Sequence, residues 1–125
     1  MFSAVILKPK SQKRLIKAFE SYAPEGWRYY AHHMTIVFNE TLPIPEDLEK
    51  NVELTVTHIG FSLKAIAFKV SGYPSKNKIP HITLAVARDS KPYLSNMIED
   101  WYSIEPVKVN GVVAETKDEF YIIKE

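Results

Sequence analysis

Two matched four-residue motifs, His33-Met34-Thr35-Ile36 and His81-Ile82-Thr83-Leu84, carry the residue types that could do chemistry. Each motif lies in a short apolar run that predicts a β-strand. Because side chains alternate between the faces of a strand, the His and the Thr of each motif share one face and the apolar residues share the other. Two imidazoles and two hydroxyls that converge on a cleft form a candidate acid–base site with donors for a phosphate. We therefore predict catalytic roles for His33, Thr35, His81 and Thr83.

Chance explains one such motif more easily than two. With 4 His and six Thr in 125 residues, random placement gives about 0.2 His-x-Thr pairs, so two pairs arise by accident in roughly 2% of such chains. The competing interpretation is that each His is a hydrogen-bonded, partly buried strand residue. The duplication, with an apolar residue at the same two places in both motifs, favours the catalytic interpretation.

Histidine and threonine suit the cleavage of a phosphodiester. The unperturbed pKa of histidine, near 6.5, allows one ring to accept a proton while another donates one. Threonine hydroxyls can donate to the nonbridging oxygens as charge shifts in the transition state. This chemistry needs no metal and no other cofactor, and the motifs leave open which histidine is the base and which the acid.

The paired motifs resemble those of the 2H phosphoesterase superfamily, in which two H-x-[ST]-φ tetrads, φ being apolar, occur in one small chain. Both tetrads fit here without departure, and they lie 48 residues apart (81 − 33). The resemblance implies an α+β, bilobal fold, in which two antiparallel sheets face a central groove, helices lie outside, and each lobe supplies one tetrad. It also implies metal-independent hydrolysis by two histidines.

Further residues could contact a substrate. Lys76 and Lys78 precede the second motif and could reach a phosphate, although loop lysines are usually solvated. Three tyrosines could stack on a nucleobase, although each is more often a core residue. These are Tyr30, Tyr73 and Tyr121.

We predict no chemical role for two more histidines: His32 is a structural or edge-exposed residue, and His58 is a surface or packing residue. His32 should point away from His33 by strand alternation, and His58 has no Thr two residues on. The spacing of the histidines matches no compact metal-ligand pattern, so we predict no metal site.

The order of the elements follows from apolar periodicity and turn residues. We expect two helices, from about Gln12 to Tyr22 with Ser11 as N-cap, and from about Pro92 to Tyr102. The expected strands are 2–7, 32–38, 52–61, 65–70, 79–86, 107–115 and 119–124, with a short extended segment at 27–30 and a loop at 39–49.

Length and composition predict a single domain over residues 1–125, with 46% hydrophobic residues available for one core. The net charge of +1 argues against binding to long duplex nucleic acid but permits a small phosphate ligand. The absence of cysteine, of a membrane-spanning run and of a signal-peptide pattern predicts a cytoplasmic protein, which we expect to be monomeric.

The expected function is a metal-independent phosphodiesterase acting on a nucleotide. Two substrates remain open: a cyclic di- or trinucleotide, as for the phage anti-defence (anti-CBASS) proteins that the small chain resembles, or a 2′,3′-cyclic phosphate at an RNA end. The alternative from another class is a binding module that sequesters a cyclic nucleotide without cleaving it. A purely structural interaction domain would leave the duplicated motifs unexplained.

Overall fold

The computed structural model describes residues 2–117, and in this range the fold is mostly β. Seven strands form one sheet in the order β2-β6-β3-β1-β7-β4-β5, and all their pairings are antiparallel. The strands are β1 (Phe2–Leu7), β2 (Arg28–Tyr29), β3 (His33–Phe38), β4 (Asn51–Phe61), β5 (Ala65–Ser71), β6 (His81–Val86) and β7 (Asp100–Thr116). The helix α1 (Pro9–Phe19) and the short 3₁₀ helices η1 (Glu20–Tyr22), η2 (Pro45–Asp47) and η3 (Pro92–Met97) complete the described chain.

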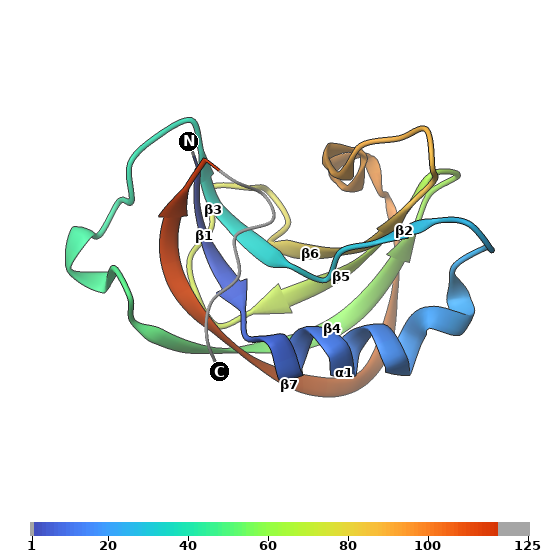
Figure 1. Cartoon of the computed structure of the whole chain (residues 1–125), viewed down its shortest axis with the longest axis horizontal. Coiled ribbons are helices and arrows are strands. Elements are labelled where there is room, and N and C mark those ends of the chain that lie inside the picture. The colour runs from blue at the N-terminus through green and yellow to red at the C-terminus, as the bar shows by residue number, and fades with distance from the viewer. Residues whose placement is uncertain (1, 118–125) are drawn as a thin grey trace.

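The sheet closes on itself, because β6 pairs with β5 as well as with β3. Six strands therefore form a closed barrel, and β2 is an additional strand that lies beside β6 (Figure 1). Closure leaves the six barrel strands with partners on both edges, which removes the exposed edges of an open sheet. The barrel wall is also where both motifs lie, since β3 and β6 begin at His33 and His81.

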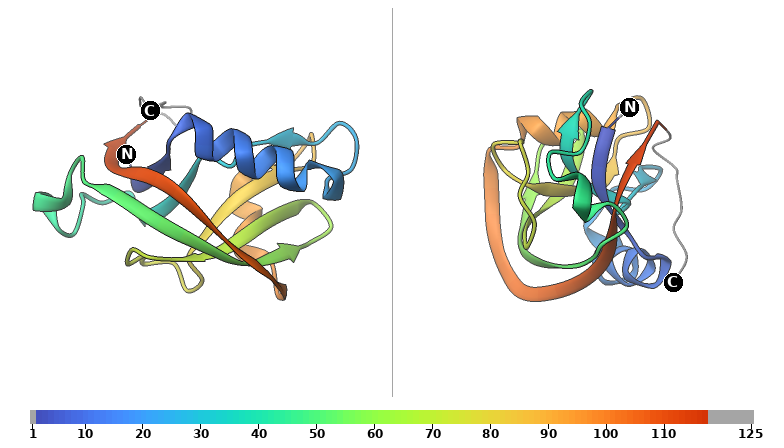
Figure 2. Two further views of the ribbon diagram at one scale, coloured as in Figure 1. Left: turned by 90° about the horizontal axis from the view of Figure 1, so that it is seen from below. Right: turned by 90° about the vertical axis from the view of Figure 1, so that its left-hand side faces the viewer.

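The expected α+β bilobal fold with two facing antiparallel sheets is therefore wrong. The strand that makes the difference is β7, which is 17 residues long and pairs with β4 along most of its length. Its C-terminal half also pairs with β1, so one continuous strand joins what would otherwise be separate sheets (Figure 2). Such pairing depends on long-range register, which is not readable from local periodicity.

Bulges and a glycine allow the wall to curve. The register shifts in the β1–β3, β4–β5, β4–β7 and β5–β6 pairs, and such bulges bend a strand and increase its twist. Gly111 lies where β7 crosses close to β1, since a Cβ at this position would come 2.7 Å from the carbonyl oxygen of Ile6. Only a residue without a side chain fits this approach.

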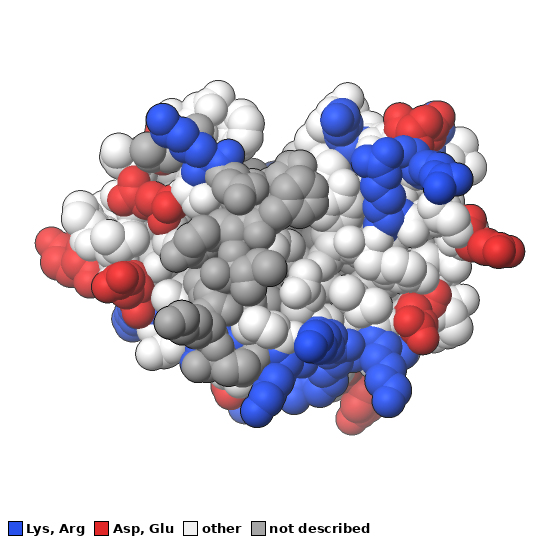
Figure 3. Space-filling model, in the orientation of Figure 1, with Lys and Arg blue, Asp and Glu red and all other residues white. Residues whose placement is uncertain are grey.

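One apolar core fills the barrel, and α1 covers it on the side away from β3 and η3 (Figure 1). Leu15 of α1 is completely buried. Phe19 packs edge-on against the buried Phe68 of β5, with 4.9 Å between the ring centroids. The opposite face of α1 carries Lys10, Lys13, Arg14 and Lys17. Basic side chains gather at the bottom of Figure 3, where α1 lies in the same orientation in Figure 1.

Several predicted elements differ from the structure at their ends. The first helix begins at Pro9, because proline suits the first helical position, and it ends at Phe19. Ser11 does not cap it; its hydroxyl accepts a hydrogen bond from the backbone N–H of Asn110. The strand prediction for 119–124, and with it Tyr121, lies outside the described residues.

The predicted second helix is wrong. Residues 92–97 form the 3₁₀ helix η3, and the chain is already in β7 from Asp100. The apolar residues that suggest a helical stripe, Ile98 and Trp101, instead pack on the outside of the barrel. The predicted strand at 107–115 is the second half of the longer β7.

The remaining strands and turns agree closely with the prediction. The runs 2–7, 32–38, 52–61, 65–70 and 79–86 correspond to β1, β3, β4, β5 and β6 within two residues at each end. In the described part of the chain, no helix combines the length and apolarity that crossing a membrane requires.

Candidate active site

The two motifs lie on neighbouring strands of the barrel wall. β3 pairs with β6 through Met34 and Ile82, and both of these side chains are completely buried in the core. In an antiparallel ladder, the residue before one member of such a pair lies opposite the residue after the other member. Continuing the register by one residue in each direction places His33 opposite Thr83 and Thr35 opposite His81.

These four side chains, which we call the His–Thr quartet, share the outer face of the wall. The burial of the two strands alternates accordingly, with His33, Thr35, His81 and Thr83 partly exposed and the residues between them buried. The two histidines are diagonal neighbours, which in sheets are typically about 7 to 8 Å apart. Both rings can therefore approach one phosphate. The motifs do not face each other from two sheets, as the bilobal fold would require.

The quartet opens into a cavity of about 600 Å³. One wall is formed by the start of β1 and the end of β3, and the other by η3. Figure 1 shows these two parts of the chain on opposite sides of a gap, and Figure 3 shows the surface hollowed between them. The volume is within the range of about 300 to 1,000 Å³ that is typical of small-molecule sites.

His81 is oriented by the backbone. Its Nδ1 lies 2.8 Å from the carbonyl oxygen of Ile79, to which it must donate, because a carbonyl only accepts. This hydrogen bond leaves Nε2 as the nitrogen that can exchange a proton with a ligand. Burial lowers the pKa of His81, and the hydrogen bond to Ile79 acts in the opposite direction.

His33 is oriented by its neighbour His32. The two Nδ1 atoms are 2.8 Å apart, and the ring of Phe2 packs against His33 with 5.0 Å between centroids. The pKa of His33 is lowered from 6.5 to about 3, chiefly because burial disfavours the charged ring, and further by the proximity of His32 and His81. His33 is therefore a neutral imidazole across the physiological pH range.

The sequence interpretation of His32 is wrong, because His32 lines the cavity beside His33. The backbone before β3 is not a regular strand: Ala31 has a positive φ of 47°, which is unusual for a residue with a side chain. This conformation interrupts the alternation on which the prediction depended. The carbonyl of His32 accepts a hydrogen bond of 2.9 Å from the N–H of Leu7, which connects the irregular segment to the end of β1.

The threonines of the quartet differ in their surroundings. The hydroxyl of Thr83 lies 2.7 Å from the hydroxyl of Ser95, which is buried in η3. The side chain of Thr35 has no hydrogen-bond partner among residues 2–117. Its carbonyl accepts a bond of 2.7 Å from Ser75, and the N–H of Lys76 donates to the carbonyl of Ile36 at 2.8 Å. These bonds fasten the loop between β5 and β6 to β3.

Small residues on the barrel allow η3 to lie next to the quartet. A Cβ on Gly60 of β4 would come 2.6 Å from the ring of Trp101 and 2.7 Å from Ile98. Ile98 packs with Ala65 and Ala67 on the outer face of the barrel, and this cluster also contacts Tyr30. The contacts hold the segment that contains η3 against the wall, where it forms one side of the cavity.

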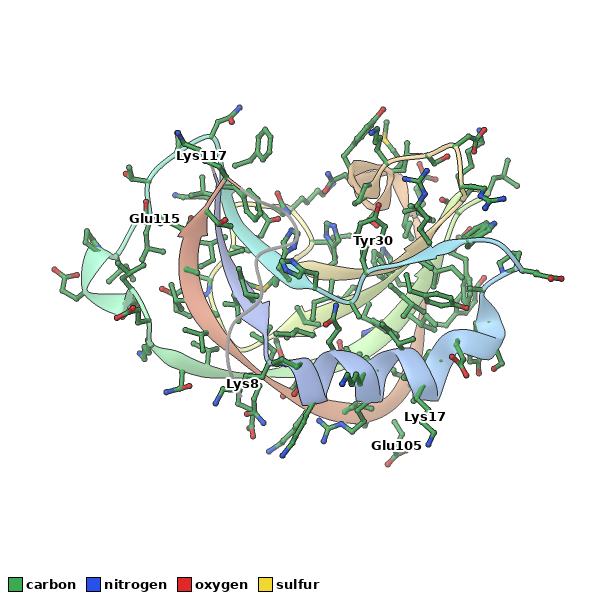
Figure 4. All side chains as sticks on the ribbon, in the orientation of Figure 1. Lys8, Lys17, Tyr30, Glu105, Glu115 and Lys117 are labelled. Atoms are coloured by element: carbon green, nitrogen blue, oxygen red, sulfur yellow. The ribbon has the colours of Figure 1, made fainter. Side chains whose placement is uncertain are left out.

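Of the predicted substrate-binding residues that lie within residues 2–117, the structure brings only Tyr30 to the cavity. Tyr30, labelled in Figure 4, lies below η3. Tyr73 and Lys76 line a second cavity of about 180 Å³, and Lys78 lines neither. The hydroxyl of Tyr73 donates to Asp47 at 2.5 Å, and burial together with this bond raises the pKa of Tyr73 to about 12.

Most of the cavity lining could not be predicted from the sequence. Asn77 could have been suggested by its place between the two proposed lysines, but no local signal distinguishes the others from ordinary surface or loop residues. The cavity residues that the sequence did not indicate for substrate are Phe2, His32, Phe38, Asn77, Lys91, Pro92, Tyr93 and Asn96.

No group of three or more His, Cys, Asp and Glu side chains within residues 2–117 is placed to hold a metal ion. In the comparisons with known proteins, no family matches the chain and no curated protein matches its sequence. The candidate site therefore has to be interpreted from its own geometry.

Proposed function

We propose that the protein is a phosphodiesterase of the 2H type that cleaves a nucleotide phosphodiester by two-histidine acid–base catalysis. One observation carries the proposal: the pairing of β3 with β6 at Met34 and Ile82 gathers the His–Thr quartet at one cavity. Two rings for proton transfer and two hydroxyls for the phosphate oxygens are the groups that such a reaction needs.

In this proposal His33 is the general base. The lowered pKa keeps the ring neutral in the free protein, and the negative phosphate of a bound substrate raises its basicity. Its Nδ1 is engaged by His32, so Nε2 is the nitrogen that can accept a proton from the attacking water. That tautomer requires His33 to donate from Nδ1 to His32. A bond then forms between the attacking oxygen and phosphorus while the bond from phosphorus to the leaving oxygen breaks.

His81 is the general acid. The substrate's negative phosphate favours the protonated ring, and the carbonyl of Ile79 stabilises the same state by accepting from Nδ1. Nε2 then donates a proton to the leaving oxygen. The oxygen of the Thr83 hydroxyl can accept from Ser95, while its hydrogen is donated to the carbonyl of Pro92 in a long bond of 3.5 Å. In this proposal that hydrogen turns from the carbonyl to the phosphate, to which the hydroxyl of Thr35 also donates.

Leaving-group dependence tests these roles. We expect His33→Ala and His81→Ala each to lower kcat/KM for a dinucleoside phosphate or cyclic dinucleotide by about 10² to 10⁴-fold. A nucleoside p-nitrophenyl phosphate has a leaving group that needs no proton, so His81→Ala should retain most of the wild-type rate on it. His33→Ala should remain defective on both substrates.

The same assay separates the alternatives. Activity is expected to persist in EDTA, and its loss with rescue by a divalent ion would indicate a metal-dependent enzyme instead. If the wild-type protein binds nucleotides tightly but cleaves none of a panel that includes cyclic mono-, di- and trinucleotides and 2′,3′-cyclic RNA ends, the sequestering function replaces the catalytic one. Equal binding by the two alanine variants would support that outcome.

A further inference from the structure

Each wall of the cavity carries an exposed aromatic ring. Phe38 is the last residue of β3 and is 68% exposed, and Tyr93 belongs to η3 and is 65% exposed. Both line the same cavity. The end of β3 and η3 lie on opposite sides of the gap in Figure 1, and both residues line the cavity together with the His–Thr quartet.

These rings are not explained by the packing of the barrel. Neither Phe38 nor Tyr93 stacks on another ring within residues 2–117, whereas Phe2, which also lines the cavity, is buried against His33. Large apolar surface exposed inside a cavity indicates that a ligand covers it. Nucleobases are suitable ligands, because every base has a π-face that stacks on an aromatic side chain.

Polar groups beside the rings complement the same ligand. Lys91 precedes η3 and lines the cavity, where its charge can attract a phosphate group. Asn77 and Asn96 also line the cavity, and carboxamides can hydrogen-bond the polar edge of a base. The N–H of Asn77 donates to Ser75 at 3.1 Å, which restrains its backbone.

We propose that each wall binds one nucleobase, and that the substrate is therefore a phosphodiester that links two nucleosides. The inference rests on the proposed function, since the quartet must hold the scissile phosphate between the walls. Such a substrate places one base on each side of its phosphate, next to Phe38 and Tyr93. A 2′,3′-cyclic phosphate at an RNA end carries a single base at the reacting phosphate and would leave one ring exposed.

The test uses Phe38→Leu and Tyr93→Leu, which retain an apolar side chain but remove the ring. On a ribodinucleoside phosphate, each variant should lower kcat/KM by about 5- to 150-fold, the usual effect of losing one stacked base. Tyr102→Leu is the matched control, because Tyr102 is 57% exposed but does not line the cavity. This control should keep the wild-type rate.

Substrates that lack one base assign each ring to its side. Three analogues carry hydrogen in place of a base: one in the 5′ nucleoside, one in the 3′ nucleoside and one in both. A substitution that removes a ring should no longer lower kcat/KM on the analogue that lacks the base stacked on that ring, because the interaction is already absent. We expect this for Phe38→Leu on one single-base analogue and for Tyr93→Leu on the other. On the analogue without either base, both variants should match the wild type.

The inference is overturned if both variants match the wild type on the complete dinucleoside phosphate, or if both lose their effect on the same analogue. Either result leaves the proposed hydrolysis intact, since cleavage by the wild type is measured in the same assay. If the wild type cleaves nothing, the proposed function fails, and the same set of variants and analogues is compared through dissociation constants measured by calorimetry. In that case the inference requires each variant to weaken binding of the complete ligand and to lose this effect on a different single-base analogue. Any other pattern of dissociation constants overturns it.

Discussion

At the scale of single residues, the site consists of two histidines with different surroundings. His33 is enclosed by His32 and Phe2, while His81 is held by a backbone carbonyl. The motifs are identical in type, so the difference between them arises from what packs against each ring. In the proposed function, this difference is the reason for taking His33 as the base and His81 as the acid, which the motifs alone leave open.

The lowered pKa of His33 predicts a pH-dependent stability. In the unfolded chain the ring has a pKa near 6.5, whereas in the folded protein it is about 3. Between these values the unfolded state binds a proton that the folded state does not, so stability falls as pH decreases from 6.5 and this loss ends below about pH 3. Above pH 6.5 the contribution is constant.

Denaturant unfolding at pH 7.5 and pH 5.0 measures this effect. We expect the wild type to lose about 1 to 2 kcal/mol more than His33→Gln between the two pH values, because glutamine does not titrate. Carboxylates distant from His33 contribute equally in both proteins and cancel in the comparison. Parallel losses in the two proteins would contradict the lowered pKa.

At the scale of elements, η3 connects the architecture to the site. It lies on the outer face of the barrel because Gly60, Ala65 and Ala67 leave room for Ile98 and Trp101. The hydroxyl pair of Ser95 and Thr83 then links η3 to the quartet. The same short helix thus positions a threonine of the quartet and supplies one wall of the cavity.

Ser95→Ala tests this connection. Loss of the hydrogen bond to Thr83 should lower the free energy of unfolding by about 1 kcal/mol, and kcat/KM should fall because Thr83 is no longer oriented. Ser62→Ala is the control, because Ser62 accepts a hydrogen bond of 3.1 Å from the N–H of Ala65 in the turn between β4 and β5. It should show a comparable loss of stability and unchanged kcat/KM; equal activity in both variants would argue against the role of Ser95.

At the scale of the whole molecule, the closed barrel is the support for the site. The side chains that alternate with the His–Thr quartet are buried in the core, so the floor of the cavity is the outer surface of a packed wall. Phe68 is completely buried in this core and contacts Phe19 of α1. The helix and the barrel are therefore stabilised by the same residues.

Removing the ring of Phe68 tests this dependence. Phe68→Ala should lower the free energy of unfolding by about 3 to 5 kcal/mol, since it leaves a cavity in a core that relaxes only partly. Leu63→Ala, at a position that is 95% exposed, should change it by less than about 0.5 kcal/mol. Thermal or denaturant unfolding of the two variants makes the comparison, and a small effect at Phe68 would contradict a single shared core.

The sequence by itself determined the features that depend on local periodicity. Alternation in the runs around His33 and His81 predicts strands with the histidine and threonine on one face, and the structure has these strands with that pattern of burial. The gaps between the expected strands 52–61, 65–70 and 79–86 also agree with the turns on either side of β5. The pairing of residues distant in sequence is not encoded in such patterns.

Tertiary structure decided how these pieces combine. The closure of the barrel depends on β6 pairing on both edges and on β7 reaching two strands, which replaces the expected two-sheet fold. The orientation of His32 depends on the positive φ of Ala31, which breaks the strand period. The two walls of the cavity, which carry Phe38 and Tyr93, are formed by β3 and η3, two segments that are distant in the sequence. Register, closure and packing minimise the free energy of the whole chain, so no single stretch of sequence specifies them.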